Sequence, residues 1–397
     1  MKWREKSVMK RFCRIVITSL ISFAFFSSSA FAASESGVNM APRAKSAILM
    51  EMDSGTVLYE KKPDEKLAPA SITKVMTMLL IMEAIDRGEL KLTDQVRTSE
   101  RAASMGGSQI FLQPGEVMTV EDMIKGIAIA SANDASVAMA EHIGGTEEAF
   151  VARMNERAKQ LGMNNTHFVN SNGLPSPDHY STARDIAIMS RELLKHEIIT
   201  KYTGIYQDYL RKDSSNPFWL VNTNRLVRFF EGVDGLKTGY TSEARYCLAA
   251  TAKRNNMRLV AVVLGEPDAK TRNSEVGAMF TYGFNHFQVF PLYKKGDVIQ
   301  IAQVDKGKRP TVNIVTSQPV SLLAKKGEKP DAFSKDIVML PSLQAPVKKT
   351  DVVGHIFIKK DGKEIARIDL RPDQTIEQAG MWEILKRSTR KILISYE

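Results

Sequence analysis

The pattern of apolar and polar positions divides the chain into segments of different secondary structure. The stretch AKSAILMEMDSGTVLYEKK, residues 44–62, alternates apolar and polar residues on both sides of DSG, which is typical of a β-hairpin. The stretch LAPASITKVMTMLLIMEAI, residues 67–85, predicts an apolar helix that opens at Ser71. Residues 93–230 mostly show a helical pattern, broken by loops rich in Gly, Pro and Asn. The stretch CLAATAKRNNMRLVAVVLG, residues 247–265, predicts two strands around a polar turn.

Strands at both ends of a helical middle predict an α/β (α+β) domain over residues 37–290, in which helices pack on one sheet. The pattern changes near Pro291, where short β-rich runs separated by turns begin. The segment KKDGKE, residues 359–364, is a hairpin-turn signal between two such runs. We therefore expect a second, small β domain over residues 291–373.

Residues 1–32 have the pattern of an export signal. A basic start is followed by the apolar run IVITSLISFAFF and by small residues around Phe31, so cleavage after Ala32 is expected. The apolar run is too short for a good membrane span. Cleavage would leave Cys247 as the one cysteine, so no internal disulfide can form, and its apolar neighbours predict a buried structural thiol.

The last segment, residues 374–397, has helical periodicity with an apolar and a basic face. Two interpretations are open: an amphipathic helix lying in a membrane interface, or a helix docked on its own β domain. We favour the membrane, because the β domain needs no such cover. The apolar face is formed by Met381, Trp382, Leu385, Ile392, Leu393 and Tyr396.

The net charge of the chain limits the kinds of molecule that it is expected to bind. Loss of residues 1–32 removes six basic residues and one acidic residue, so the formal charge falls from +10 to +5. A mild positive excess suits an anionic envelope or membrane surface. An exported chain without a basic stripe interleaved with aromatics is not expected to bind nucleic acid.

The most informative chemistry lies at the start of the first helix. Ser71 and Lys74 are three residues apart, so a helix places them side by side, and a neutral lysine amine could accept the serine proton. The apolar run after Lys74 would lower its pKa by desolvation. Helix-start N–H groups could also stabilise an oxyanion. The plain alternative is that Ser71 caps the helix and Lys74 reaches solvent.

Two later motifs favour the catalytic interpretation. Ser131-Ala132-Asn133 falls at a break between two apolar helical stretches, where polar groups need partners. Lys237-Thr238-Gly239 stands at the predicted start of a strand, where a cation and a hydroxyl could bind a carboxylate and the glycine allows close approach. The plain alternative for the Ser131 motif is an ordinary helix cap, and that for the Lys237 motif is a turn that enters an edge strand.

In this order, S-x-x-K, S-x-N and K-T-G form the motif set of penicillin-binding proteins and class A β-lactamases. With PASITKVMT, GGSQIFL, HYSTARDIA, NTNRL and VDGLKTGYT, the chain resembles the serine-type D-alanyl-D-alanine carboxypeptidases, low-molecular-mass penicillin-binding proteins of type 5, over residues 40–397. It looks most like the sporulation-type enzymes of spore-forming Gram-positive bacteria. The resemblance implies a β-lactamase-like transpeptidase domain with an antiparallel sheet, a small β-sandwich domain and a C-terminal amphipathic helix.

The resemblance also implies roles for eight residues. Ser71 would attack the penultimate D-Ala carbonyl, Lys74 would take its proton, and Ser131 would relay a proton to the leaving D-Ala. The substrate-binding residues would be Asn133 for the amide, Lys237, Thr238 and Gly239 for the carboxylate side, and Tyr240, whose N–H would complete the oxyanion hole with that of Ser71.

Around this site the resemblance implies peptidoglycan stem peptides and β-lactams as partners, an exported, extracytoplasmic enzyme at the cell wall and the membrane surface, and a monomer. No cofactor or metal is expected, because the sequence has neither H-E-x-x-H nor paired Cys/His spacing. Tyr240 stands where some relatives have histidine, which leaves fine substrate preference and pH profile open.

Three competing functions remain. A class A β-lactamase needs a further glutamate for deacylation, and no E-x-x-L-N segment lies between Ser131 and Lys237. A catalytically silent wall-binding protein would not need the five polar motif side chains. A Ser-His-Asp hydrolase could use Asp178 and His179, but no G-x-S-x-G surrounds a serine. The glycine-containing loop MGGSQIFLQPGE is expected to approach the cleft rim near Ser108, unless it is a plain surface turn.

Overall fold

The computed structural model describes residues 39–360 and 362–382 of the chain. The expected export signal, residues 1–32, lies outside the described residues, as does most of the expected C-terminal helix, residues 374–397. Within the part of the chain that is described, none of the helices combines the length and apolarity of a membrane span.

The first domain is built on a five-stranded antiparallel sheet with the order β2-β1-β9-β8-β7. The predicted hairpins around DSG and KRNN are confirmed as β1–β2 and β8–β9, the latter closed by Asn255 and Asn256 at positive φ. Lys237 lies in the middle of β7 rather than at its start. The strands are β1 (Ser46–Glu51), β2 (Val57–Lys61), β7 (Val233–Thr241), β8 (Arg245–Arg254) and β9 (Met257–Glu266).

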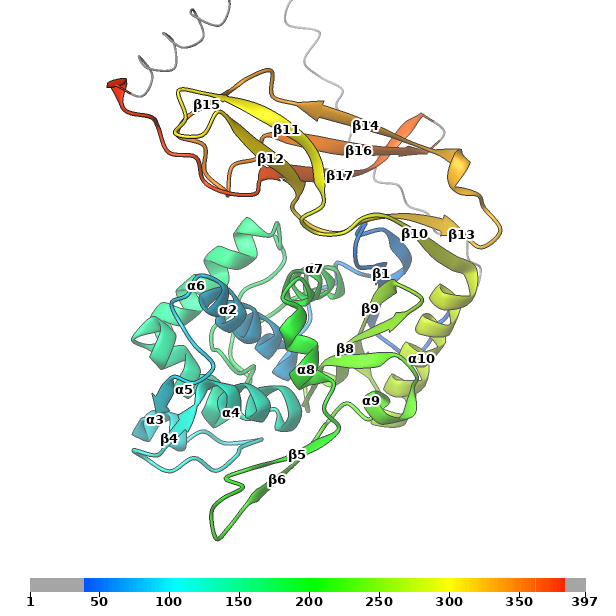
Figure 1. The fold of residues 1–397 in the computed structure, drawn as a ribbon. Coiled ribbons are helices and arrows are strands. Elements are labelled where there is room, and N and C mark those ends of the chain that lie inside the picture. The colour runs from blue at the N-terminus through cyan, green and yellow to red at the C-terminus, as the bar shows by residue number, and fades with distance from the viewer. Residues whose placement is uncertain (1–38, 361, 383–397) are drawn as a thin grey trace, which may run out of the picture. The chain divides into compact units, whose positions relative to one another are not determined.

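Both faces of this sheet are buried, and strand β9 shows how. Leu259, Ala261 and Val263 point to one side, where they pack with helix α10 (Ala269–His286). Val260 and Val262 point to the other side, into the core shared with helices α2 (Lys74–Asp86) and α7 (Ala183–Leu194). Figure 1 shows α10 on one side of the sheet and α2 and α7 on the other. Burial on both faces explains why this strand is a continuous apolar run.

The segment between β2 and β7 is mostly helical, as its periodicity predicts. Two short strand pairs lie within it: β3 (Gln95–Arg97) with β4 (Val117–Thr119), and β5 (Gln207–Leu210) with β6 (Phe218–Val221). Its other elements are the 3₁₀ turn η1 (Ala70–Thr73), α3 (Glu100–Ala103), α4 (Val120–Lys125), the π-helical turn η2 (Gly126–Ala130), α5 (Asn133–Gly144), α6 (Glu147–Gln160), η3 (Glu197–Ile199), α8 (Thr200–Thr203) and α9 (Leu226–Phe229).

The C-terminal part is β-rich. One sheet has the order β14-β16-β17-β12-β11-β15, and β10 pairs with β13. The hairpin predicted at KKDGKE is confirmed by the pairing of β16 with β17. The elements are β10 (Phe287–Tyr293), β11 (Val298–Asp305), β12 (Thr311–Thr316), β13 (Val320–Lys325), η4 (Pro330–Ala332), β14 (Phe333–Met339), β15 (Leu343–Gln344), β16 (Gly354–Lys360) and β17 (Lys363–Pro372).

Two expected boundaries differ from the structure. The boundary between residues 290 and 291 falls inside β10, whose pairing with β13 places Phe287 and the rest of that strand in the β-rich part. The segment 374–380 is not helical: Ile376 bridges to Val347, Gln378 bridges to Gly307, and Ile376 is buried. Burial of Ile376 in the β-rich core overrides the local helical period, and helix appears only at Met381 and Trp382.

Candidate active site

The candidate nucleophile lies in a backbone turn that is held from both sides. Ser71 belongs to the 3₁₀ turn η1, and its side chain makes no helix-capping hydrogen bond, so the simple capping interpretation is wrong. Ala70, just before it, has φ of 48°, a conformation that non-glycine residues rarely adopt. Strain of this kind persists only where surrounding contacts enforce it.

Two glycines supply the close contacts around this turn. A Cβ on Gly239 of strand β7 would lie 2.9 Å from the Pro69 carbonyl oxygen and 3.2 Å from the Ala70 Cβ. A Cβ on Gly173, which has φ of +83°, would lie 1.9 Å from the Ala70 carbonyl oxygen. Neither position has room for a side chain, so the Ser71 turn is wedged between β7 and the 170–181 loop.

Lys74 is fully buried one turn after Ser71. Its Nζ lies 3.1 Å from Ser71 Oγ, 2.6 Å from Asn133 Oδ1 and 2.6 Å from the Asn172 carbonyl oxygen. Burial, and next the positive charge of Lys237, hold the pKa of Lys74 well below its usual value, while the charge of Asp134 acts in the opposite direction.

This environment suits a general base. A neutral amine has two N–H donors and one lone pair, and the two carbonyl oxygens of Asn133 and Asn172 take the two donors. The lone pair is then left for the hydroxyl hydrogen of Ser71. The same contacts rule out a Lys74 that reaches solvent, since its side chain is 0% exposed.

Ser131 and Asn133 lie where two helical segments meet. Ser131 follows η2 with φ of 66° and is 4% exposed, with its side chain lining the same cleft as Ser71. Asn133 begins α5 and does not line that cleft. Its Oδ1 accepts from Lys74, and its Nδ2 donates to the Gly106 carbonyl oxygen at 2.7 Å. In this structure the Asn133 amide therefore holds the base and a loop.

That loop contains Ser108 and forms part of the rim, as predicted for MGGSQIFLQPGE. It is fixed by the Asp134 carboxylate, which is fully buried and accepts hydrogen bonds from the N–H groups of Ile110 and Leu112 at 3.1–3.2 Å. Asp134 could not be recognised from the sequence as part of the site, because an acidic residue in the first turn of a helix is already explained by the helix dipole.

Lys237 and Thr238 approach the cleft from β7, which is the edge strand of the sheet. Lys237 is 1% exposed, and its Nζ donates to the Thr238 carbonyl oxygen at 3.0 Å. Burial, and next the charge of Arg272, lower the pKa of Lys237 to about 7. The Thr238 hydroxyl donates to Thr223 Oγ1 at 2.7 Å. Besides burial, the positive charge of Lys237 in turn lowers the pKa of Lys74.

These elements surround a cleft of about 710 Å³. The lining includes the cations Arg225, Lys270 and Arg272 but no carboxylate side chain. Arg272 was missed from the sequence, where it is one more basic residue in a helix. The cleft is lined by Ser71, Ser108, Ser131, Val221, Asn222, Thr223, Arg225, Thr238, Gly239, Tyr240, Tyr246, Ala269, Lys270, Arg272 and Asn273.

The contacts of His179 and Cys247 show whether either residue could take part in catalysis. His179 is buried, with Nε2 2.8 Å from Thr73 Oγ1 and Nδ1 accepting from the Val169 N–H, so it has no hydrogen bond to Ser71. These hydrogen bonds join the loop that carries His179 to the Ser71 turn and to Val169. Cys247 is a free, fully buried thiol, as predicted, and burial raises its pKa to about 11. Among the described residues no cluster of side chains could hold a metal ion.

A serine in a strained turn, a buried lysine beside it and a cationic cleft at a sheet edge define an acyl-transferring serine enzyme. Residues 31–268 match the family model described as D-alanyl-D-alanine carboxypeptidase, and residues 287–378 match that of the penicillin-binding protein 5 C-terminal domain. The chain belongs to the serine-type D-alanyl-D-alanine carboxypeptidase family.

Individual relatives agree with this assignment. The chain is 52% identical to the D-alanyl-D-alanine carboxypeptidase DacF of Bacillus subtilis over 94% of this chain and 97% of that protein, which fits the resemblance to enzymes of spore-forming bacteria. Penicillin-binding protein 5 from Haemophilus influenzae has a similar structure, with a TM-score of 0.66, 33% identity, and coverage of 85% of this chain and 98% of that one. Penicillin-binding protein D2 from Listeria monocytogenes, solved in an ampicillin-bound form, has a TM-score of 0.57 and 29% identity, and the match covers 62% of this chain and 100% of that one.

Proposed function

We propose that this protein removes the terminal D-Ala from D-Ala-D-Ala stem peptides of peptidoglycan through an acyl-enzyme on Ser71. The observation that carries the proposal is the buried Lys74 amine 3.1 Å from Ser71 Oγ, beside the cationic Lys237. Family membership supplies the substrate class.

In the acylation step, Lys74 takes the Ser71 proton while Oγ attacks the carbonyl of the penultimate D-Ala. The N–H groups of Ser71 and Tyr240 are our candidates for the oxyanion hole. As the C–N bond breaks, the proton passes to the leaving amine, with Ser131 as the relay. Thr238 and Arg272, which line the cleft, would hold the terminal carboxylate with a hydroxyl and a positive charge, and the buried Lys237 would add its charge from within β7.

In the second step, water attacks the Ser71 ester, the ester C–O bond breaks, and the serine hydroxyl is restored. A class A β-lactamase speeds this step with an added glutamate. The absence of a carboxylate side chain from the cleft lining favours slow deacylation of penicillins instead. The ampicillin-bound form of the Listeria protein supports the proposal that this chain also binds penicillins.

The test is the intact mass of the chain starting at residue 33, followed over time with benzylpenicillin. We expect a long-lived one-to-one adduct that is absent in Ser71→Ala, and D-Ala release from a D-Ala-D-Ala peptide by the unmodified enzyme. Rapid penicillin turnover without an adduct would favour a β-lactamase. A chain that gives neither adduct nor turnover would be catalytically silent.

We also propose that the enzyme is a monomer that works outside the cytoplasm, with residues 381–397 bringing it to the membrane surface. The basic and apolar side chains of that segment support the proposal, as an amphipathic helix binds anionic lipid surfaces. In a flotation assay with anionic vesicles, a protein of residues 33–397 should float with the vesicles, and a protein truncated to residues 33–380 should not. Equal flotation of both would contradict the anchoring role, and light scattering would test the monomer.

A further inference from the structure

A second cavity is lined by residues that neighbour those of the active-site cleft in sequence. We call it the side pocket; its volume is about 660 Å³. Ala68 in its floor is three residues before Ser71, and Glu243 in its wall is three residues after Tyr240. The side pocket is lined by Lys45, Lys66, Leu67, Ala68, Pro175, Ser176, Pro177, Asp178, His179, Tyr180, Glu243 and Ala244.

The geometry of β7 gives the direction in which a bound peptide would run. With the terminal carboxylate at Thr238 and the scissile carbonyl at Ser71, the remaining residues of the peptide must leave past Tyr240 toward the turn of residues 242–244. The outer edge of β7 is the edge of the sheet, where an extended peptide can add as a further strand. The third residue from the C-terminus then lies roughly 7 Å beyond the first, at about 3.3 Å per residue, in the direction in which the chain continues from Tyr240 of the cleft to Glu243 of the side pocket.

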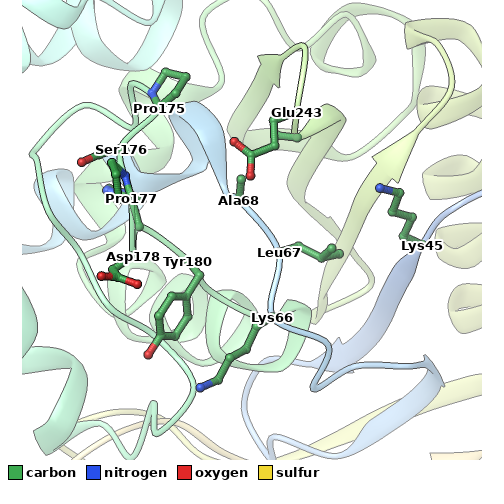
Figure 2. Close-up of a pocket in the computed structure, with 12 residues that line it drawn as sticks. Lys45, Lys66, Leu67, Ala68, Pro175, Ser176, Pro177, Asp178, Tyr180 and Glu243 are labelled. Atoms are coloured by element: carbon green, nitrogen blue, oxygen red, sulfur yellow. The ribbon is translucent and has the colours of Figure 1, made fainter.

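The side pocket offers separate charges of both signs. Figure 2 shows the Glu243 carboxylate and the Lys45 amine pointing over the floor formed by Leu67 and Ala68. Both side chains are exposed, and within the described residues neither has a hydrogen-bond or ion-pair partner. Lys66, by contrast, is engaged at the opposite end, where its amine lies 4.6 Å from the centre of the Tyr180 ring.

We propose that the side pocket binds the side chain of the third stem residue and selects a diamino acid there, in particular one whose side chain ends in an amine and a carboxylate. The inference rests on the proposed function, because it requires the peptide to be acylated at Ser71. Glu243 binds the amine, Lys45 binds the carboxylate, and the methylene groups lie on Leu67 and Ala68. A diaminopimelate residue uses both contacts, a lysine residue only that with Glu243, and an uncharged residue neither.

Both ion pairs would be partly exposed, so the selectivity is modest: each contributes about a two- to fivefold preference, as exposed pairs do. The plain alternative is that Glu243 and Lys45 are solvated surface charges, as most exposed charges are. The two alternatives differ in one measurable quantity, the preference among peptides that differ only at the third residue.

The experiment compares three peptides that end in D-Ala-D-Ala and carry meso-diaminopimelate, L-lysine or L-norleucine as the third residue. The readout is kcat/KM for D-Ala release at low ionic strength. We expect the order diaminopimelate, lysine, norleucine for the wild type. Glu243→Gln should lower the ratio of lysine to norleucine about two- to fivefold, and Lys45→Met should lower the ratio of diaminopimelate to lysine by a similar factor.

Two control variants remove a matching charge elsewhere. Glu231→Gln removes an exposed carboxylate and Lys159→Met an exposed amine, and neither residue lines the side pocket or the cleft. Both should keep the wild-type ratios. Equal kcat/KM for the three peptides, or ratios unchanged by Glu243→Gln and Lys45→Met, would overturn the side-pocket proposal alone. No D-Ala release by the wild type from any peptide would overturn the proposed function and this inference with it.

Discussion

A single methyl group added to Gly239 should reduce acylation far more than it reduces stability. The Cβ of a Gly239→Ala variant would lie 2.9 Å from the Pro69 carbonyl oxygen, 3.2 Å from the Ala70 Cβ and 3.2 Å from Ile72 Cγ1. These distances are several tenths of an ångström below ordinary contact, and the first is to backbone, so the turn that carries Ser71 must move away from β7.

The magnitude follows from how far the nucleophile moves. A misplacement of about 1 Å can cost about 100-fold in rate, so a shift of several tenths of an ångström should slow benzylpenicillin acylation about 10- to 100-fold. Overpacking of this kind costs about 1–3 kcal/mol of unfolding free energy, and each kcal/mol lowers Tm by about 2–4 °C in a domain of this size.

The assay combines the second-order rate of acylation, from intact mass against time, with thermal unfolding. Gly277→Ala in α10 is the matched control, since its Cβ would meet the Phe230 ring at 3.4–3.5 Å, an ordinary contact, and it should keep the wild-type rate. A Gly239→Ala enzyme acylated at the wild-type rate would refute the reasoning. So would a loss of rate that accompanies global unfolding, because the predicted effect is local.

Three further predictions concern ionisable groups. Acylation needs a neutral Lys74 and a cationic Lys237, so kcat/KM against pH should fall on the acid side as Lys74 gains its proton and on the alkaline side as Lys237, with a pKa of about 7, loses its own. Lys237→Arg should move the alkaline limb to higher pH, and an unmoved limb would contradict this. Asp134→Asn should shift the acid limb to lower pH, because the charge of Asp134 raises the Lys74 pKa, and should lower the unfolding free energy in urea by about 1–3 kcal/mol; unchanged values would contradict it. Cys247 should react with a thiol reagent only after unfolding in guanidinium, and rapid labelling of the native protein would show that its burial is incomplete.

The local sequence pattern was sufficient to predict the main helices and strands and the side chains of the three motifs. Alternation predicts the hairpins on either side of DSG and KRNN, and the three-residue spacing of Ser71 and Lys74 is enough to bring Nζ to Oγ. Such features depend on neighbours in sequence, and short-range geometry governs them.

The features that sequence reasoning missed depend on contacts between distant segments. Ala70, whose φ is positive, packs closely against Gly173, about 100 residues away in sequence. The partners of the Asn133 amide, Lys74 and Gly106, come from two other segments. The expected start of the C-terminal helix, residues 374–380, was wrong for the same reason, because Ile376 is buried by β-rich residues that are distant in sequence.

Because the turn that carries Ser71 is held between two distant segments, penicillin labelling of Ser71 reports whether the tertiary contacts around this turn are intact. The helix that contains Lys74 can keep its hydrogen bonds while the sheet edge and the 170–181 loop loosen, because those bonds are local to the helix. The position of Ser71 cannot survive that loosening, since Gly239 and Gly173 lie on the two segments that would part. In gradual denaturation, labelling should therefore disappear before the far-ultraviolet helix signal, and the fraction of a preparation that binds penicillin counts the correctly folded molecules.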